Sequence, residues 1–233
     1  MNKNYSISFI VPALNEERVL TKYLNDALDI IGRTIDDYEI ILINDGSTDK
    51  TGELMTSIAL KFANVFVLNN KKNIGLGNCY KLGISHSRKE YTMLLCGDGG
   101  LPVKSLPPIF SKIGQADIVI PWMQNLKEIK SPSRYLLSQA YTNLLNKIFS
   151  LNLKYYNGLS VHKTSNIKSL QISSGGFGFQ AEILIKLLKS GSSYIEAPVW
   201  GAEEKGSSFA LRPRNWISVA KTIFRLVFEV NLR

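Results

Sequence analysis

Short runs of β-branched and aliphatic residues alternate with helical patterns through the first half of the chain, and this alternation most constrains the fold. Strands are expected at residues 8–11, 38–43, 65–68, 91–95 and 117–120. Helices are expected between them, at residues 16–31, 50–62 and 77–87. The first helical segment has apolar residues at the i, i+3, i+4, i+7 spacing of a one-sided helix. Strands that alternate with helices predict parallel βαβ units, so we expect an α/β fold with a mostly parallel, helix-covered sheet.

Two prolines are expected to end strands, because proline has no N–H to give to a sheet ladder. Pro12 follows the first strand and Pro121 follows the fifth. After Pro121 the pattern changes to a long amphipathic helix at residues 133–149, a helix at residues 180–189 and a strand at residues 194–199.

Composition limits the class of protein. The chain has 233 residues, 45% of them hydrophobic, which is enough for one full domain. Two cysteines cannot build a disulfide framework, and we see no signal peptide and no membrane-spanning run, so a cytoplasmic protein is expected. A net charge of +9 suggests an anionic partner, but the basic residues are spread out and lack interleaved aromatics, so nucleic acid is not expected.

Four polar loops follow expected strands. They comprise residues 12–16, 44–49, 73–77 and 96–100, and each contains residues typical of turns, namely Asn, Asp, Gly or Ser. One such loop is ordinary turn chemistry. Four of them at the carboxyl edge of one sheet predict a ligand site, because ligands of α/β proteins bind there. The chain has neither the glycine pattern of a dinucleotide-binding turn nor that of a P-loop.

The residues in and near these loops carry a family resemblance. Residues 10–17 (IVPALNEE) resemble a V-P-x-x-N-E motif, residues 43–51 (INDGSTDKT) a V-D-D-G-S-x-D-x-T motif, and residues 73–77 (NIGLG) an N-x-G-x-G motif. Residues 97–99 (GDG) stand at a D-x-D position, while residues 178–182 (GFQAE) and 196–199 (EAPV) are similar to G-F-x-F-Q-x-E and E-V-P-V. Together they resemble glycosyltransferase family 2 enzymes with a GT-A fold, in particular the dolichol- or polyprenyl-phosphate sugar synthases.

The resemblance implies a metal-assisted, inverting transfer of a sugar from a nucleotide donor, linked to UDP or GDP, to a polyprenyl phosphate. The donor-binding residues that it implies are Pro12, Ala13, Asn15, Glu16, Asn44, Asp45, Asn73, Gly75 and Gly97. Asp45 can accept hydrogen bonds from a base N–H or from ribose hydroxyls, and Glu16 and Pro12 would line the other side of the nucleoside.

Asp98 is expected to bind Mg²⁺ or Mn²⁺ and to act in catalysis, because a hard cation that bridges phosphates prefers oxygen ligands. The chain departs from the family pattern two residues earlier, where Cys96 replaces a carboxylate. A neutral thiol is a poor ligand for these ions.

The acceptor side is expected to contain Arg134, His162, Lys163, Gln180 and Lys205. A lipid phosphate is already ionised and needs cations rather than a general base. A sugar hydroxyl would need a carboxylate base, for which Glu182 is the candidate.

The C-terminal segment predicts an amphipathic helix, which divides the chain into a domain at residues 1–211 and a helix at residues 212–233. Lys221, Arg225 and Glu229 share one face, and large apolar residues occupy much of the rest. Such a helix can lie in a membrane interface or pack on the domain. We expect a peripheral protein of the cytoplasmic membrane face. A saccharide or lipid-linked glycan hydroxyl as acceptor, and a non-catalytic nucleotide-sugar-binding protein, stay open, as do the sugar, the base, the lipid and the oligomeric state.

Overall fold

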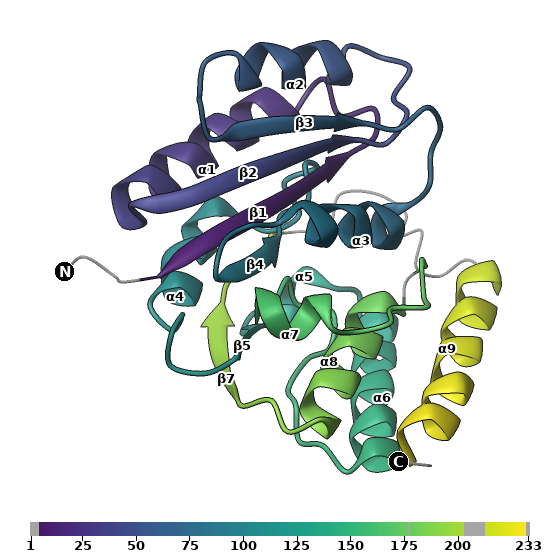
Figure 1. The fold of residues 1–233 in the computed structure, drawn as a ribbon. Helices are drawn as coiled ribbons and strands as arrows, with labels where there is room; N and C mark the ends of the chain where they lie inside the picture. Colours follow the sequence, from purple (N-terminus) through teal and green to yellow (C-terminus); the bar gives the residue numbers. More distant parts are fainter. Residues whose placement is uncertain (1–4, 177, 203–212, 232–233) are drawn as a thin grey trace.

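A seven-stranded sheet forms the centre of the protein, whose computed structural model describes residues 5–176, 178–202 and 213–231 (Figure 1). The strands lie in the order β3-β2-β1-β4-β6-β5-β7. Their bounds are β1 Ser6–Ala13, β2 Asp37–Asn44, β3 Val65–Asn69, β4 Tyr91–Leu94, β5 Ile118–Met123, β6 Val161–Lys163 and β7 Tyr194–Val199. β1 pairs in parallel with β2 and β4, whereas β6 is antiparallel to both of its neighbours. The sheet is therefore mostly parallel, as the alternating pattern predicts.

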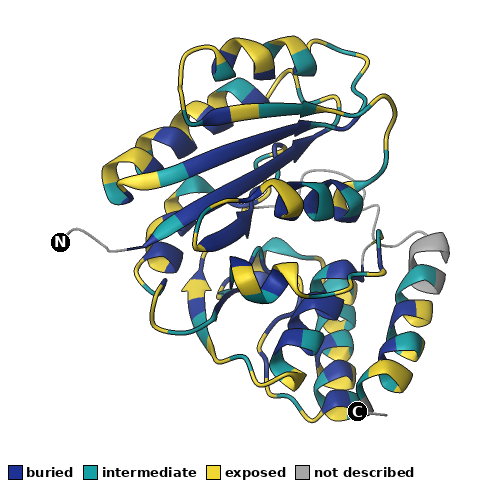
Figure 2. Cartoon of the chain, in the orientation of Figure 1, coloured by how far each residue is buried: buried dark blue, intermediate teal, exposed yellow. Residues whose placement is uncertain are grey.

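Helices cover both faces of this sheet. One set comprises α1 Leu20–Thr34, α2 Thr51–Ala59, the short 3₁₀ turn η1 Val103–Ser105 and α4 Leu106–Phe110. The other comprises α3 Leu76–His86, α6 Pro132–Phe149, α7 Thr164–Lys168, α8 Phe179–Lys189 and α9 Pro213–Asn231, with α5 Leu126–Ile129 leading into α6. Figure 2 shows the central strands β1 and β4 largely dark blue between helices whose outer sides carry yellow, which is the burial pattern of a three-layer fold.

Alternating side chains of the central strands supply two separate cores. Phe9 and Leu42 pack in the core beneath α1, α2 and α4. Ile10 and Ile41, each one residue along, pack in the core beneath α3, α6 and α8. Because successive strand residues point to opposite faces, a central strand buried on both sides is apolar along its length. This burial accounts for the near-continuous hydrophobic runs in the sequence.

Neither proline ends its strand, and both of those predictions are wrong. β1 continues through Pro12 to Ala13, and β5 continues through Pro121 to Met123. The Pro12 carbonyl still accepts a hydrogen bond, from the Gly97 N–H at 3.0 Å. Proline lacks a donor but keeps its acceptor, so a strand can pass through it near its end.

The C-terminal helix forms as α9 and packs against α8 (Figure 1). Leu226 and Thr222 are buried on its inner side, whereas Phe224 and Phe228 are exposed on its outer side, at 68% and 50%. The two exposed rings contact each other with centroids 4.7 Å apart. Within the described residues, no helix combines the length and the apolar character that a bilayer crossing requires.

Candidate functional site

The loops after β1 and β2 are joined by hydrogen bonds at the carboxyl edge of the sheet. The Asn15 side chain accepts the Thr48 N–H at 2.9 Å, and the Asn15 N–H donates to the Ser47 hydroxyl at 3.1 Å. The Glu16 N–H donates to the Thr51 hydroxyl at 2.8 Å. Asn15 has φ 57°, in the left-handed region that asparagine tolerates better than most residues. These bonds hold Glu16 beside the loop that begins at Asn44.

Asp45 is 4% exposed and organises the third loop. Its carboxylate accepts hydrogen bonds from the Asn70 amide at 3.0 Å, the Ile74 N–H at 2.8 Å and the Gly75 N–H at 2.9 Å. The neighbouring Asn44 side chain accepts the Ser47 N–H and donates to Asn69. Both residues shape the edge through protein contacts, and Asn73 lies exposed on the loop that Asp45 holds.

Gly97 allows the β4 loop to approach β1. A Cβ at Gly97 would lie 2.8 Å from the Cβ of Ala13, closer than packed carbon atoms come. Pro12 and Ala13 are themselves buried, so they form the base of this edge through their backbone. A larger residue at position 97 would push the following Asp98 away from Glu16.

Asp98 is exposed at the end of β4, with one carboxylate oxygen accepting the Gly100 N–H at 2.9 Å. Burial, and then the charges of Asp98 and Asp49, raise the pKa of Glu16. Negative charge is thus concentrated here, which favours a cation. Groups of three or more metal-ligating side chains are absent from the described residues. One carboxylate completed by phosphate oxygens and water is nevertheless a common way to bind Mg²⁺, so the residues present fit such an ion.

Cys96 lies between these acidic groups and β4. Burial, followed by the charges of Asp98 and Glu16, raises the pKa of its thiol. The thiol therefore stays protonated at neutral pH and supplies no charge to a cation.

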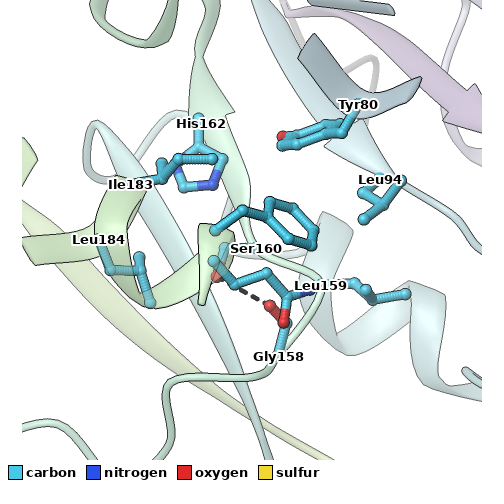
Figure 3. Close-up of a pocket in the computed structure, with 10 residues that line it drawn as sticks. Tyr80, Leu94, Gly158, Leu159, Ser160, His162, Ile183 and Leu184 are labelled. Carbon is cyan, nitrogen blue, oxygen red and sulfur yellow. Dashed lines mark hydrogen bonds between the residues drawn. The ribbon is translucent and has the colours of Figure 1, made fainter. Parts of the chain in front are cut away.

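His162 does not have the environment of a cation, and its part in acceptor binding stays a prediction. The residue is 4% exposed, and burial lowers its pKa to about 3, so the imidazole is neutral at physiological pH. It lines a small pocket together with Tyr80, Leu94 and Gln180 (Figure 3). His162 Nδ1 and the Tyr80 hydroxyl have no hydrogen-bond partner among the described residues.

For Lys163 the structure contradicts the prediction, because the residue does not lie on the acceptor side. The antiparallel register pairs it with Tyr91, the first residue of β4, and its N–H donates to the Asp117 carbonyl. It therefore lies at the amino edge of the parallel strands, opposite Asp98. The sequence could not reveal this, because the three-residue β6 was not recognised as a strand.

Arg134 lies in the first turn of α6, and its charge lowers the pKa of Lys130, after the larger effect of burial. The Lys130 ammonium lies 5.7 Å from the centre of the Tyr155 ring. The sequence analysis missed Lys130, whose only signal was its position four residues before Arg134. Gln180 lies in the first turn of α8 and stays a prediction, and Lys205 lies outside the described residues.

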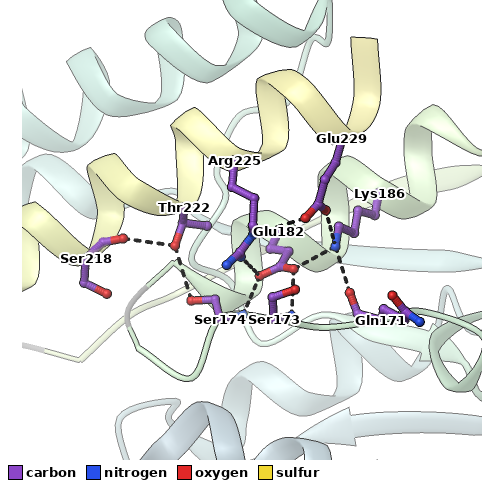
Figure 4. A network of polar contacts seen from close by, with 9 residues as sticks. All are labelled: Gln171, Ser173, Ser174, Glu182, Lys186, Ser218, Thr222, Arg225 and Glu229. Atoms are coloured by element: carbon purple, nitrogen blue, oxygen red, sulfur yellow. Dashed lines mark hydrogen bonds and ion pairs between the residues drawn. The ribbon is translucent and has the colours of Figure 1, made fainter. Parts of the chain in front are cut away.

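Glu182 is fully buried, and its geometry does not favour the general-base role (Figure 4). Its oxygens accept hydrogen bonds from the Ser173 and Ser174 N–H groups at 2.9 and 2.8 Å. Lys186 and Arg225 complete its surroundings at 2.8 and 2.9 Å. Burial alone would raise the pKa of Glu182, but these donors together lower it, so the carboxylate is a fixed anion within the protein. Sequence analysis missed the pairing of α8 with Arg225.

Known proteins resemble the chain in sequence and in structure. A dolichyl-phosphate beta-glucosyltransferase of Trichomonas vaginalis is 33% identical over 144 residues, which are 57% of this chain and 45% of that protein. The chain thus spans less than half of that relative. An undecaprenyl-phosphate mannosyltransferase of Micrococcus luteus is 25% identical over 206 residues, 84% of this chain and 83% of that protein.

A solved structure shares the fold. It is glucosyl-3-phosphoglycerate synthase from Mycobacterium tuberculosis, crystallised with Mn²⁺, UDP and phosphoglyceric acid. The TM-score is 0.67 at 16% identity, covering 96% of this chain and 79% of that one. The architecture is therefore that of the GT-A glycosyltransferases.

The sequence model of glycosyl transferase family 2 matches residues 8–181, which contain most of β1, all of β2 to β6 and the loops with Asp45 and Asp98. The match covers well over half of the chain, and the sheet has the expected architecture. The chain belongs to glycosyl transferase family 2.

Proposed function

We propose that the protein is a glycosyltransferase that moves a sugar from a nucleoside-diphosphate donor to a polyprenyl phosphate, with inversion. The observation that carries this proposal is the exposed Asp98 beside Glu16, at the edge where Asp45 holds the third loop. The relatives named for dolichyl-phosphate and undecaprenyl-phosphate transfer support the acceptor class.

The proposed reaction is a direct displacement at the sugar C1. A phosphate oxygen of the acceptor forms the new C1–O bond while the bond to the donor diphosphate breaks, and the nucleoside diphosphate leaves with the electron pair. The acceptor phosphate is ionised near neutral pH, so no side chain has to remove a proton. With Glu182 held by four donors, this acceptor suits the site better than a sugar hydroxyl, which needs a base.

The proposed cofactor is Mg²⁺ or Mn²⁺, with Asp98 as its protein ligand. When bound, the ion offsets the charge that develops on the departing diphosphate. The neighbouring structure with Mn²⁺ and UDP supports both this cofactor and a uridine donor. Cys96 adds no charge, so we expect weaker metal binding than a second carboxylate would give.

On the acceptor side, we propose that Arg134 and Lys130 attract the lipid phosphate. Burial and Arg134 both lower the pKa of Lys130, and an anion bound between the two cations would relieve their repulsion.

A water-insoluble acceptor also requires contact with a membrane. The exposed Phe224 and Phe228 of α9 are the proposed contact, at the cytoplasmic face.

The test is turnover with a defined acceptor. Purified protein is incubated with Mn²⁺, a radiolabelled UDP-sugar or GDP-sugar and a short-chain polyprenyl monophosphate, and the lipid fraction is counted. We expect a labelled lipid-phosphate sugar and release of the nucleoside diphosphate. Transfer to a saccharide hydroxyl instead would establish the alternative acceptor. Nucleotide-sugar binding without transfer to either acceptor would establish a non-catalytic binding protein, the alternative that Cys96 motivates.

A further inference from the structure

A glycine-rich loop, whose described residues are 173–176 and 178, lies between α9 and the start of α3. On one side, a Cβ at Gly176 would lie 2.8 Å from the Ser218 hydroxyl, and a Cβ at Gly178 would lie 3.0 Å from the Thr222 side chain. On the other side, the Gly175 carbonyl lies 2.8 Å from the position of a Cβ at Gly77. The described part of this loop thus contacts both helices through its backbone.

Glu182 fixes this loop relative to α9. The same carboxylate accepts the N–H groups of Ser173 and Ser174 from the loop and the guanidinium of Arg225 from α9 (Figure 4). The Thr222 hydroxyl lies 3.4 Å from the Ser174 hydroxyl, and Glu229 of α9 pairs with Lys186 at 2.8 Å. A buried carboxylate loses much of its stabilisation when one of its charged partners is removed. Arg225 therefore contributes to the position of the loop as well as to the packing of α9.

The far side of the loop touches the third polar loop of the carboxyl edge. A Cβ at Gly175 would lie 2.8 Å from the Asn78 side chain, whose amide donates to the Ile74 carbonyl at 2.7 Å. The Ile74 N–H in turn donates to Asp45. The contacts therefore run from Arg225 through Glu182 to Ser174, and from the adjacent Gly175 through Asn78 and Ile74 to Asp45.

We propose that Arg225 and Glu182 are positioning residues for nucleotide binding, holding residues 173–176 against the start of α3 so that the Asp45 loop stays in its binding geometry. The proposal assigns α9 a role at the donor site. It rests on the proposed function for its ligand, a nucleoside diphosphate, and on the contacts above for the coupling.

The chain supplies a matched control in its other buried carboxylate pair. Glu39 accepts the Ser8 hydroxyl at 2.7 Å, the Arg88 N–H at 2.7 Å and the Arg88 side chain at 2.9 Å. This pair lies at the start of β2, at the opposite edge of the parallel strands from Asp45. Arg88→Met removes the guanidinium that pairs with the buried Glu39, just as Arg225→Met removes the one that pairs with Glu182. Arg88 does not contact the described part of the glycine-rich loop, so this variant leaves that loop unchanged.

The experiment has two readouts on the full chain. The first is the Kd for UDP in buffer with Mn²⁺, together with the donor KM and the kcat. Arg225→Met should raise Kd and KM by about threefold to tenfold with little change in kcat, because couplings of this kind are of modest size. Arg225→Lys should restore most of the affinity, and Arg88→Met should leave it unchanged.

The second readout needs no nucleotide. Hydrogen exchange at the amides of residues 74–79 should be faster in Arg225→Met than in the wild type, and unchanged in Arg88→Met. Should Arg225→Met not fold, Thr222→Val removes the hydroxyl contact with Ser174 at constant shape and should produce a smaller shift of the same sign.

Unchanged exchange at residues 74–79 in a folded Arg225→Met variant would overturn the inference, whether or not UDP binds. Equal weakening of UDP binding by Arg88→Met would also overturn it, because general destabilisation would then explain the effect. Failure of the wild type to bind either UDP or GDP counts against the proposed function instead, while the exchange measurement still decides the coupling.

Discussion

Asp98 and Cys96 follow β4 two residues apart and differ in charge. Asp98 is exposed, whereas the raised thiol pKa keeps Cys96 neutral. Motif matching identified Asp98 from the sequence. The position of Lys163 and the burial of His162 both depend on β6. No local sequence pattern reveals this strand, because it has only three residues.

Replacement of Asp98 should separate metal binding from folding. Asp98→Asn removes the exposed charge while leaving the shape of the loop, so we expect Mn²⁺-dependent UDP binding to weaken by about tenfold or more, equal to about 1.4 kcal/mol or more. The melting temperature should not change. Cys96→Asp should tighten Mn²⁺ binding if both positions contact one ion. Calorimetric titration with Mn²⁺ in the presence of UDP measures both effects, and wild-type Mn²⁺ dependence in Asp98→Asn would remove Asp98 from the metal site.

His162 should make the protein less stable as the pH falls. Its folded pKa is about 3 against an ordinary 6.5, because burial penalises the charged ring. Below pH 6.5 the unfolded chain binds a proton that the folded chain does not, so the free energy of unfolding falls by up to about 1.4 kcal/mol per pH unit. Urea unfolding at several pH values should show a flatter slope in His162→Gln, with His86→Gln as the control. An unaltered slope in His162→Gln would mean that the His162 ring has the same pKa in the folded and the unfolded chain.

At the scale of elements, α9 differs most from what its sequence suggests. Its charged residues Arg225 and Glu229 pair with Glu182 and Lys186 of α8, while Phe224 and Phe228 face outward. Helical periodicity predicts the existence and nearly the ends of this helix. It cannot predict which face packs inward, because that choice depends on a buried carboxylate more than thirty residues earlier in the chain. The same limit applies to Pro12 and Pro121, whose strands continue because neighbouring strands still pair with them.

Phe224 and Phe228 lie on the exposed side of α9, and we expect their rings to insert into a membrane surface. Phe224→Ser with Phe228→Ser should strongly reduce sedimentation with anionic vesicles, because a buried Phe side chain contributes about 1.5–3 kcal/mol. Lys221→Ala should have a smaller, salt-sensitive effect of about 1 kcal/mol. Leu60, 84% exposed after α2 on the other face of the sheet, provides the control variant Leu60→Ser. Equal sedimentation of the double variant and the wild type would assign these rings to another partner.

For the whole molecule, two buried glutamates connect distant parts of the chain. Glu39 joins β2 to the segment before β4, and Glu182 joins α8 to α9 and to residues 173 and 174. Burial acts to raise the pKa of both carboxyls, but their hydrogen bonds and the neighbouring cations outweigh it and lower each pKa below 4.5. The folded protein therefore depends on two carboxylates that must stay ionised.

Acid unfolding should follow from these two groups. A carboxyl with a lowered folded pKa contributes stability that is present above its unfolded pKa and is lost as the pH falls through the folded value. We therefore expect the free energy of unfolding to decline more steeply below about pH 4.5 than the His162 proton alone explains. Urea unfolding of Glu39→Gln should show a shallower acid slope together with lower stability at pH 7, because the amide cannot pair with Arg88. If Glu39→Gln kept the wild-type slope below pH 4.5, the Glu39 carboxyl would have the same pKa in the folded and unfolded chains, and its hydrogen bonds with Ser8 and Arg88 would not favour the ionised form.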